Sequence, residues 1–113
     1  SGGVTLLGTV AGAIGAIAMG IIALLAGWEI PAMVAAIAGG IGGCTLDSIL
    51  GGAVQTRRWC DHCNTMTERV VHDCGTTTRV SAGLPWLDND AVNAVSTTFG
   101  ALLGFLCILA SRF

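Results

Sequence analysis

The stretch IPAMVAAIAGGIGGCTLDSILGGAVQT, residues 30–56, carries a single charged side chain, that of Asp47. Residues 1–28 and residues 91–111 carry none. Each of these stretches exceeds the roughly 20 residues that a helix needs to cross the hydrocarbon core of a bilayer. A helix of a soluble bundle would need a polar face, which these stretches lack. The sequence therefore predicts an all-α polytopic membrane protein. Three transmembrane helices are expected, near residues 6–27, 31–55 and 90–110.

The overall composition excludes most other classes of protein. Charged residues make up 11% of the chain, against about 25% in soluble domains, and the mean hydropathy is +0.77. The net charge of -2 argues against a nucleic-acid partner, which would require a clustered basic face. The first apolar stretch lacks the basic start and the short apolar core of a signal peptide. The expected partner is therefore the lipid bilayer.

The charge pattern also divides the chain. Residues 1–56 are expected to form transmembrane helices one and two, residues 57–87 a polar cysteine-rich loop, and residues 88–113 transmembrane helix three. The chain starts without methionine. We therefore expect it to be the C-terminal part of one longer membrane domain, with upstream transmembrane helices of the same protein as its neighbours.

The arginines predict the orientation of the chain. Four of the five lie in the loop: Arg57, Arg58, Arg69 and Arg79. The opposite side has only Arg112 and Glu29. Because arginines in short loops favour the cytoplasmic side, we expect a multi-pass protein of the cell membrane. Its loop 57–87 and its N-terminus would face the cytoplasm, and its C-terminus would lie outside.

Small residues recur at every fourth position in each predicted helix. The three stripes are Gly8, Gly12, Ala16 and Gly20; Gly39, Gly43, Asp47, Gly51 and Gln55; and Ser96, Gly100 and Gly104. Such stripes let helix backbones approach one another closely. Because Asp47 belongs to the second stripe, its carboxylate is expected on a packing face, away from lipid.

The loop contains two pairs of residues that can bind a metal. Cys60 and Cys63 form a C-x2-C pair, and His72 and Cys74 form the second pair. This spacing predicts a tetrahedral Cys3His zinc site, and a reducing cytoplasmic face favours a metal over a disulfide. Free thiols in a mobile loop and a redox role of the C-x2-C pair are the alternatives.

The same loop is expected to contain a small zinc-ribbon-like β-hairpin. Residues 66–71 and 76–80 are rich in β-branched side chains and flank a turn at Asp73 and Gly75. A hairpin this short has almost no core, so a bound zinc ion would supply most of its folding free energy. His62 and Asp73 compete with His72 as the fourth ligand.

Asp47 is the most informative single residue of the predicted helices. An ionised carboxylate at membrane depth costs about 2.5–3.5 kcal/mol on insertion scales, so it usually faces a partner or a polar cavity. At 1.5 Å per residue it would lie about 12–14 Å below the Arg57 end of its helix. Either Asp47 is functional, or it bonds to Ser48, Gln55 or a neighbouring helix and only stabilises packing.

A polar cluster opens the third predicted helix. It consists of Asp88, Asn89, Asp90 and Asn93. Asp88 or Asn89 can serve as an N-cap, but the cluster exceeds what capping requires, and its oxygens are ligands that Mg²⁺ can share with phosphate. Since Asp47 lies towards the same side, one polar site between the second and third helices is geometrically allowed. The glycine-rich start, residues 1–5, is either an anion site at a helix N-terminus or a flexible terminus.

Three motifs resemble the integral membrane family called domain of unknown function 92, which includes transmembrane protein 19 and a plant phytyl-phosphate kinase. The motifs are GGVT (residues 2–5), DSILGGAVQ (47–55) and LDNDAVN (87–93). The resemblance covers nearly the whole chain and implies a polytopic helical fold, of which this is the C-terminal half. Where the family commonly has Cys-Pro-x-Cys, this chain has Cys60-Asp61-His62-Cys63.

The resemblance further implies a kinase-type phosphotransferase that acts on isoprenoid, phytyl-like phosphates with Mg²⁺ and a nucleoside triphosphate. The catalytic residues that it implies are Asp47, Asp88, Asp90 and Asn93. The phosphate-binding residues that it implies are Gly2, Gly3, Thr5, Ser48 and Gln55. The alternative is a non-catalytic scaffold or transporter-like bundle with a structural zinc loop. Convergence of the polar groups in one pocket would favour the enzyme, whereas dispersed carboxylates would favour the scaffold.

Overall fold

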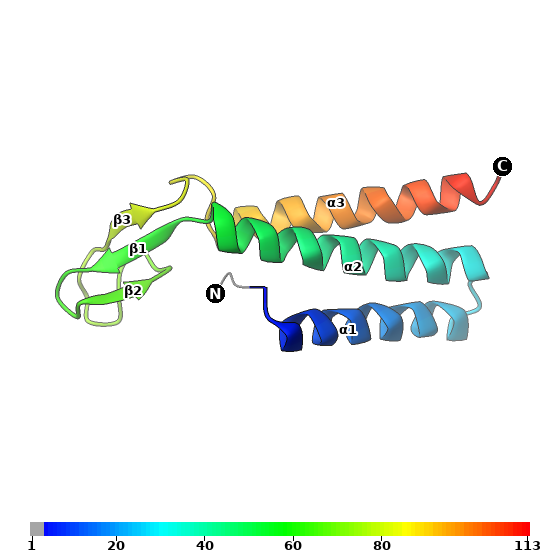
Figure 1. The fold of residues 1–113 in the computed structure, drawn as a ribbon, viewed down its shortest axis with the longest axis horizontal. Coiled ribbons are helices and arrows are strands. Elements are labelled where there is room, and N and C mark those ends of the chain that lie inside the picture. Colours follow the sequence, from blue (N-terminus) through cyan, green and yellow to red (C-terminus); the bar gives the residue numbers. More distant parts are fainter. Residues whose placement is uncertain (1–3) are drawn as a thin grey trace.

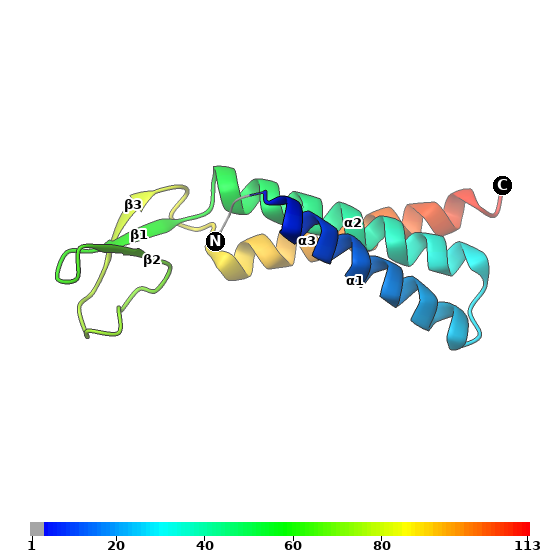
Figure 2. The same ribbon diagram turned by 60° about the horizontal axis from the view of Figure 1, so that its bottom comes forward.

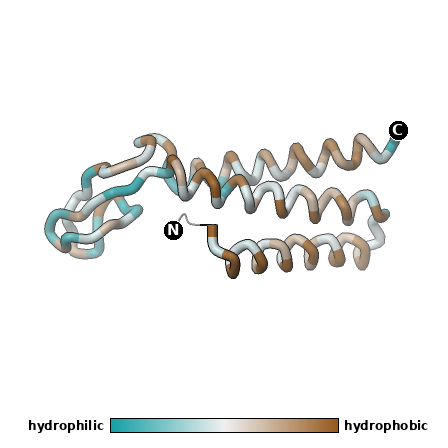
Figure 3. Tube along the Cα trace, in the orientation of Figure 1, coloured by the Kyte–Doolittle hydropathy of each residue, from teal (hydrophilic) through white to brown (hydrophobic). Residues whose placement is uncertain are grey.

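The computed structural model describes residues 4–113. Three helices lie along the long axis of the molecule: α1 (Leu6–Leu25), α2 (Ile30–Ala53) and α3 (Asn89–Ala110). Each runs antiparallel to the next one in the chain (Figure 1). Each is long and apolar enough to cross a membrane by length and composition. A small sheet projects from one end, and most of the hydrophilic residues gather there, whereas the helices are mainly hydrophobic along their length (Figure 3).

The helix ends follow from local capping. α1 starts after Thr5, whose hydroxyl accepts a hydrogen bond from Gly8 N at 3.0 Å, and it ends before Gly27, whose φ is +86°. α2 has Pro31 in its first turn, where a missing N–H costs nothing. α3 follows Asp88, whose carboxylate accepts from Ala91 N at 2.9 Å. The predicted ranges differ from the observed ones by two residues or fewer at each end.

The sheet corrects the prediction of a simple hairpin. It has three antiparallel strands, β1 (Arg57–Cys60), β2 (Thr65–Thr67) and β3 (Arg79–Ala82), in the order β2-β1-β3. The predicted arms 66–71 and 76–80 meet only at an isolated bridge between Val71 and Thr77. The central strand β1 has no β-branched residue, and Trp59 is its one residue that is enriched in strands, so local propensity predicts it only weakly. Pairing on both of its edges makes it a strand.

Backbone hydrogen bonds join the sheet to the helices at a narrow neck. Thr56 N donates to Leu87 O at 2.8 Å, and Leu84 N donates to Val54 O at 2.9 Å. Gly83 has a φ of +80°, and a Cβ there would collide with the carbonyl of Gln55. The neck therefore fixes the end of α2 against the start of α3.

The helices pack through backbone contacts at glycines. A Cβ on Gly39 would lie 2.5 Å from Gly100 O, and a Cβ on Gly100 would lie 2.6 Å from Gly39 O. On another face of α2, a Cβ on Gly40 would lie 2.9 Å from Ala16 Cβ of α1. Close approach of this kind is how transmembrane helices gain van der Waals contact. The turned view shows α1 inclined to α2 and α3 (Figure 2).

Gly100→Ala is expected to destabilise the bundle, by about 1–3 kcal/mol, because the added methyl overpacks the α2–α3 contact. Gly15→Ala is the matched control, since nothing lies within 4 Å of a Cβ there. The control should be neutral or stabilising by up to about 1 kcal/mol through helix propensity. Thermal unfolding in detergent micelles measures both variants. Equal stability of the two would contradict the observed packing.

Candidate functional site

The segment that contains the sheet, residues 57–87, is called the sheet module below. Four of its side chains lie close together. The ligand atoms of Cys60, Cys63, His72 and Cys74 all lie within 4.8 Å of one another. The Sγ atoms of Cys60 and Cys74 are 3.6 Å apart, and His72 Nδ1 lies 3.4 Å from Cys74 Sγ. The structure therefore brings together all four residues that the spacing singled out.

Two tight turns present these ligands. Cys60 ends β1 and Cys63 lies in the turn that follows it, and the residue after Cys63, Asn64, has a φ of 50°. Cys74 is followed by Gly75, whose φ is 81°. Glycine and asparagine are the residues that most readily adopt this left-handed conformation. Each turn thus reverses the chain directly after its last thiol.

The electrostatics of the cluster suit a cation. Hydrogen bonding from the Thr76 hydroxyl, with a further contribution from His72, lowers the pKa of Cys74 to about 5. Hydrogen bonding with Cys74 raises the pKa of Cys63 to about 11. At neutral pH one thiolate is therefore present, and its neighbour retains its proton. A bound metal ion would also deprotonate the neighbouring thiol, because a coordinated thiol loses its proton.

The donor set fits a structural metal ion. Three thiols and one imidazole are a common tetrahedral zinc set, and the group could bind a metal such as zinc. The competing ligands lie outside the group: Asp73 forms an ion pair with Arg69, and His62 Nδ1 lies 3.7 Å from Cys63 Sγ. Within residues 57–87, Cys60, Thr78 and Leu87 are the buried residues, so this segment has too small a core to fold by burial.

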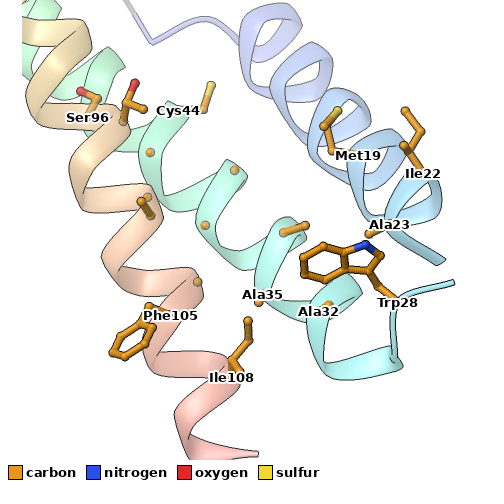
Figure 4. Close-up of a pocket in the computed structure, with 18 of the residues that line it drawn as sticks. Met19, Ile22, Ala23, Trp28, Ala32, Ala35, Cys44, Ser96, Phe105 and Ile108 are labelled. Carbon is orange, nitrogen blue, oxygen red and sulfur yellow. The ribbon is translucent and has the colours of Figure 1, made fainter. Parts of the chain in front are cut away.

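A second feature, which we call the groove, is a cavity of about 1000 Å³ between the helices. α1 and α3 both pack on α2 but, within residues 4–113, not on each other, and the groove lies between them (Figure 4). Far from the sheet, its bulky lining residues include Trp28, Phe105 and Ile108. Small alanine and glycine residues line its middle. Towards the sheet, its polar lining residues are Asp47, Asn93, Ser96 and Thr97.

The polar end of the groove has unused hydrogen-bonding capacity. Asp47 is half-buried, and it takes part in no hydrogen bond or ion pair within residues 4–113. Ser96 is 4% exposed, and its Oγ has no partner within the same residues. A buried hydroxyl without a partner costs about 1–3 kcal/mol. The contact of Gly43 with Ser96 O sets an antiparallel register that, continued by one turn, places Asp47 level with Asn93.

The other predicted residues lie elsewhere. Asp88 caps α3, and Asp90 is exposed in its first turn. Ser48 lines a separate pocket of about 140 Å³ between α1 and α2. Thr5 caps α1 and Gln55 is buried at the neck, whereas Gly2 and Gly3 lie outside the described residues. Within residues 4–113, the carboxylates of Asp47, Asp88 and Asp90 do not form a metal-ligand group. By themselves, therefore, they do not fit a preformed Mg²⁺ site.

Ser96 and Thr97 are groove residues that the sequence did not single out as polar ligands. Ser96 was expected only as a small packing residue. Thr97 follows Asn93 by one helical turn, and this spacing places two polar side chains on one face of a helix. That spacing is the signal that could have identified Thr97.

Three apolar helices that could span a membrane, with a cysteine–histidine cluster at one end that could hold a metal ion, define the class of helical membrane proteins. The chain belongs to the integral membrane protein DUF92 family, whose sequence model matches residues 1–101. No curated protein and no solved structure matches the chain.

Proposed function

We propose that this membrane protein is a phosphotransferase that binds an isoprenoid phosphate in the groove. The single observation that supports the proposal best is that the groove is apolar over most of its length and polar at one end only. An amphipathic ligand with a polar head group and one long apolar chain has the same arrangement of polar and apolar parts. Its phosphate would lie near Asp47 and Asn93, and its chain would run towards Trp28.

The dimensions of the groove favour an extended chain. From Asn93 to Ile108, α3 rises about 22 Å at 1.5 Å per residue. One leaflet of a bilayer contributes about 15 Å of hydrocarbon, half of the total thickness. A ligand that fills the groove would therefore reach past the midplane, which suits a long isoprenoid chain. The volume of about 1000 Å³ lies at the upper end of the range of small-molecule sites.

In the proposed reaction, an oxygen of the isoprenoid monophosphate attacks the γ-phosphate of a nucleoside triphosphate. The products are the isoprenoid diphosphate and the nucleoside diphosphate. A bare carboxylate repels phosphate, so Asp47 would serve the head group as a hydrogen-bond acceptor or next to a cation. Asn93, Ser96 and Thr97 can donate hydrogen bonds to phosphate oxygens.

A phosphoryl-transfer assay of the full-length protein tests this function. Phytyl and geranylgeranyl phosphates are offered with each nucleoside triphosphate labelled in its γ-phosphate. Label should appear in a lipid diphosphate. A folded protein that transfers no label in any combination would contradict the proposal.

A second candidate is a non-catalytic scaffold or transporter-like bundle with a structural zinc loop. The dispersal of the polar residues favours it: Asp88 is used as a cap, and Ser48 and Asp47 line different cavities. The convergence of Asp47 and Asn93 in the groove favours the enzyme. In the second candidate, Asp47 would serve packing or ion passage.

In both candidates, the cysteine–histidine cluster binds one structural zinc ion. The three helices span the cell membrane, with the sheet module in the cytoplasm. The domain division into residues 1–56, 57–87 and 88–113 forms part of the same proposal. It follows that the turn between α1 and α2 and the C-terminus lie outside.

Cysteine labelling tests this topology. Single cysteines are introduced at Glu29, Glu68 and Phe113, which are all exposed, while the loop thiols stay intact. A membrane-impermeant maleimide applied to intact cells should modify Glu29→Cys and Phe113→Cys but not Glu68→Cys. The unsubstituted chain gives the background, and permeabilised cells should label all three. Labelling of Glu68→Cys from outside would reverse the orientation.

A further inference from the structure

We infer that Trp28 closes the far end of the groove and limits the length of the apolar chain that the protein accepts. This inference rests on the proposed function, because that function places an isoprenoid chain in the groove. Trp28 would then be a specificity-determining residue, far from the reacting phosphates.

The position of the ring supports this role. Figure 4 shows the Trp28 indole between Ala23 of α1 and Ala32 of α2, where both flanking side chains are single methyl groups. The ring is therefore the bulky group on the α1 and α2 side of the groove, while Phe105 and Ile108 line the α3 side. Removal of the ring would leave open space next to the two alanines. Polar side chains line the opposite end of the same groove, so a ligand whose phosphate lies at the sheet end brings the far end of its chain to the ring.

Backbone hydrogen bonds fix the turn that carries Trp28. Trp28 N donates to Ala23 O at 3.0 Å, and Gly27 N donates to Leu24 O at 2.9 Å. Gly27 has a φ of 86°, a conformation that glycine adopts without strain. This turn joins α1 to α2, the two helices between which the ring lies. A side chain on a fixed turn can act as a stop, whereas one on a mobile loop would yield to a longer chain.

The competing role of Trp28 is that of an interfacial anchor. Tryptophan is enriched where helices leave the membrane, and Trp28 is 63% exposed. Trp86 offers a matched control, since it is 68% exposed, lies near the start of α3, and does not line the groove. An anchor role would make the two residues behave alike. A stop would affect chain-length preference at Trp28 alone.

The experiment measures binding of geranyl, farnesyl, geranylgeranyl and longer polyprenyl monophosphates to the full-length protein in lipid nanodiscs. In the unsubstituted protein, affinity should increase with length until the chain spans the groove and should fall for longer chains. Trp28→Ala should raise the affinity ratio of the longer polyprenyl to the geranylgeranyl ligand by about tenfold, within the range for small size changes in an apolar pocket. Trp28→Phe should change the ratio less, and Trp86→Ala should leave it unchanged.

Each other outcome contradicts a stated part of the inference. An unchanged ratio in Trp28→Ala, an equal loss of affinity for every length, or a matching shift in Trp86→Ala would each overturn the role of Trp28 and leave the proposed function standing. Absence of binding for the whole series would overturn both, and would favour another helix as the occupant of the groove.

A fluorescence measurement tests the position of the chain end without replacing Trp28, and it therefore applies even if Trp28→Ala does not fold. A bromine at the end of a geranylgeranyl chain should quench the fluorescence of Trp28 in a protein with Trp59→Phe and Trp86→Phe. A bromine next to the phosphate should not. Equal quenching by the two ligands would overturn the placement of the chain end at Trp28.

Discussion

Replacing Cys60 and Cys74 together by serine is expected to reduce bound zinc from about one ion per chain to none. Cys60 ends β1 and Cys74 lies in a separate turn. Their Sγ atoms are 3.6 Å apart, so the change removes a ligand from each half of the cluster. A serine hydroxyl does not replace a thiolate as a zinc ligand. Metal analysis of the purified protein measures the loss.

The structural consequence should be confined to the sheet module. Because the module buries few side chains, loss of the metal should unfold it, as in other small metal-dependent domains. Limited proteolysis should then cut within residues 57–87, while circular dichroism should still report helices. Cys44→Ala with Cys107→Ala is the matched control, since both thiols lie in helices outside the cluster. If zinc content survives the loss of Cys60 and Cys74, the proposed site is wrong.

Asp47→Asn is expected to lower phosphoryl transfer by about a hundredfold or more, the size of effect seen when one preorganised polar group is removed from a catalytic site. The amide keeps the shape of the side chain and removes its charge. Expression and insertion should be retained or improved, because burying a neutral amide costs less than burying a carboxylate. The phosphoryl-transfer assay measures activity, and yield in membranes measures insertion.

The comparison with Asp47→Leu separates catalysis from packing. If Asp47 only stabilises the bundle through a hydrogen bond, asparagine can replace it, and leucine is the damaging change because its neighbours lose a partner. If Asp47 serves the head group, both variants are inactive and both are well expressed. Glu68→Gln is the matched control, since Glu68 is exposed, does not line the groove and is not among the implied catalytic residues. An active, well-expressed Asp47→Asn protein would exclude a catalytic role of this residue.

The groove explains why only part of the predicted polar site could be found by spacing. Asp47 and Ser48 are neighbours in sequence, yet they line different cavities on α2, since successive residues of a helix point about 100° apart. Asp88 is not part of the polar site for a different reason: its carboxylate accepts a hydrogen bond from the first turn of its own helix. Sequence proximity therefore placed these residues at the same end of the bundle and did not place them in one site.

The sequence by itself determined the features that depend on neighbouring residues. Long stretches without charge define the three helices, because an unpaired charge in hydrocarbon is costly. The spacing within each cysteine turn defines the ligand pairs, because a turn of a few residues brings its two ends together. The family follows from the same local motifs, and its model matches residues 1–101.

Only the tertiary structure decided how these local pieces combine. The strand β1 exists because two distant segments pair with its edges. The groove exists because α1 and α3 contact different faces of α2 and, within residues 4–113, not each other. Glycine contacts such as that between Gly39 and Gly100 O set how closely, and therefore at what register, two helices meet. This register brings Asp47 level with Asn93. It depends on contacts between the two helices and cannot be predicted from the sequence of either helix alone.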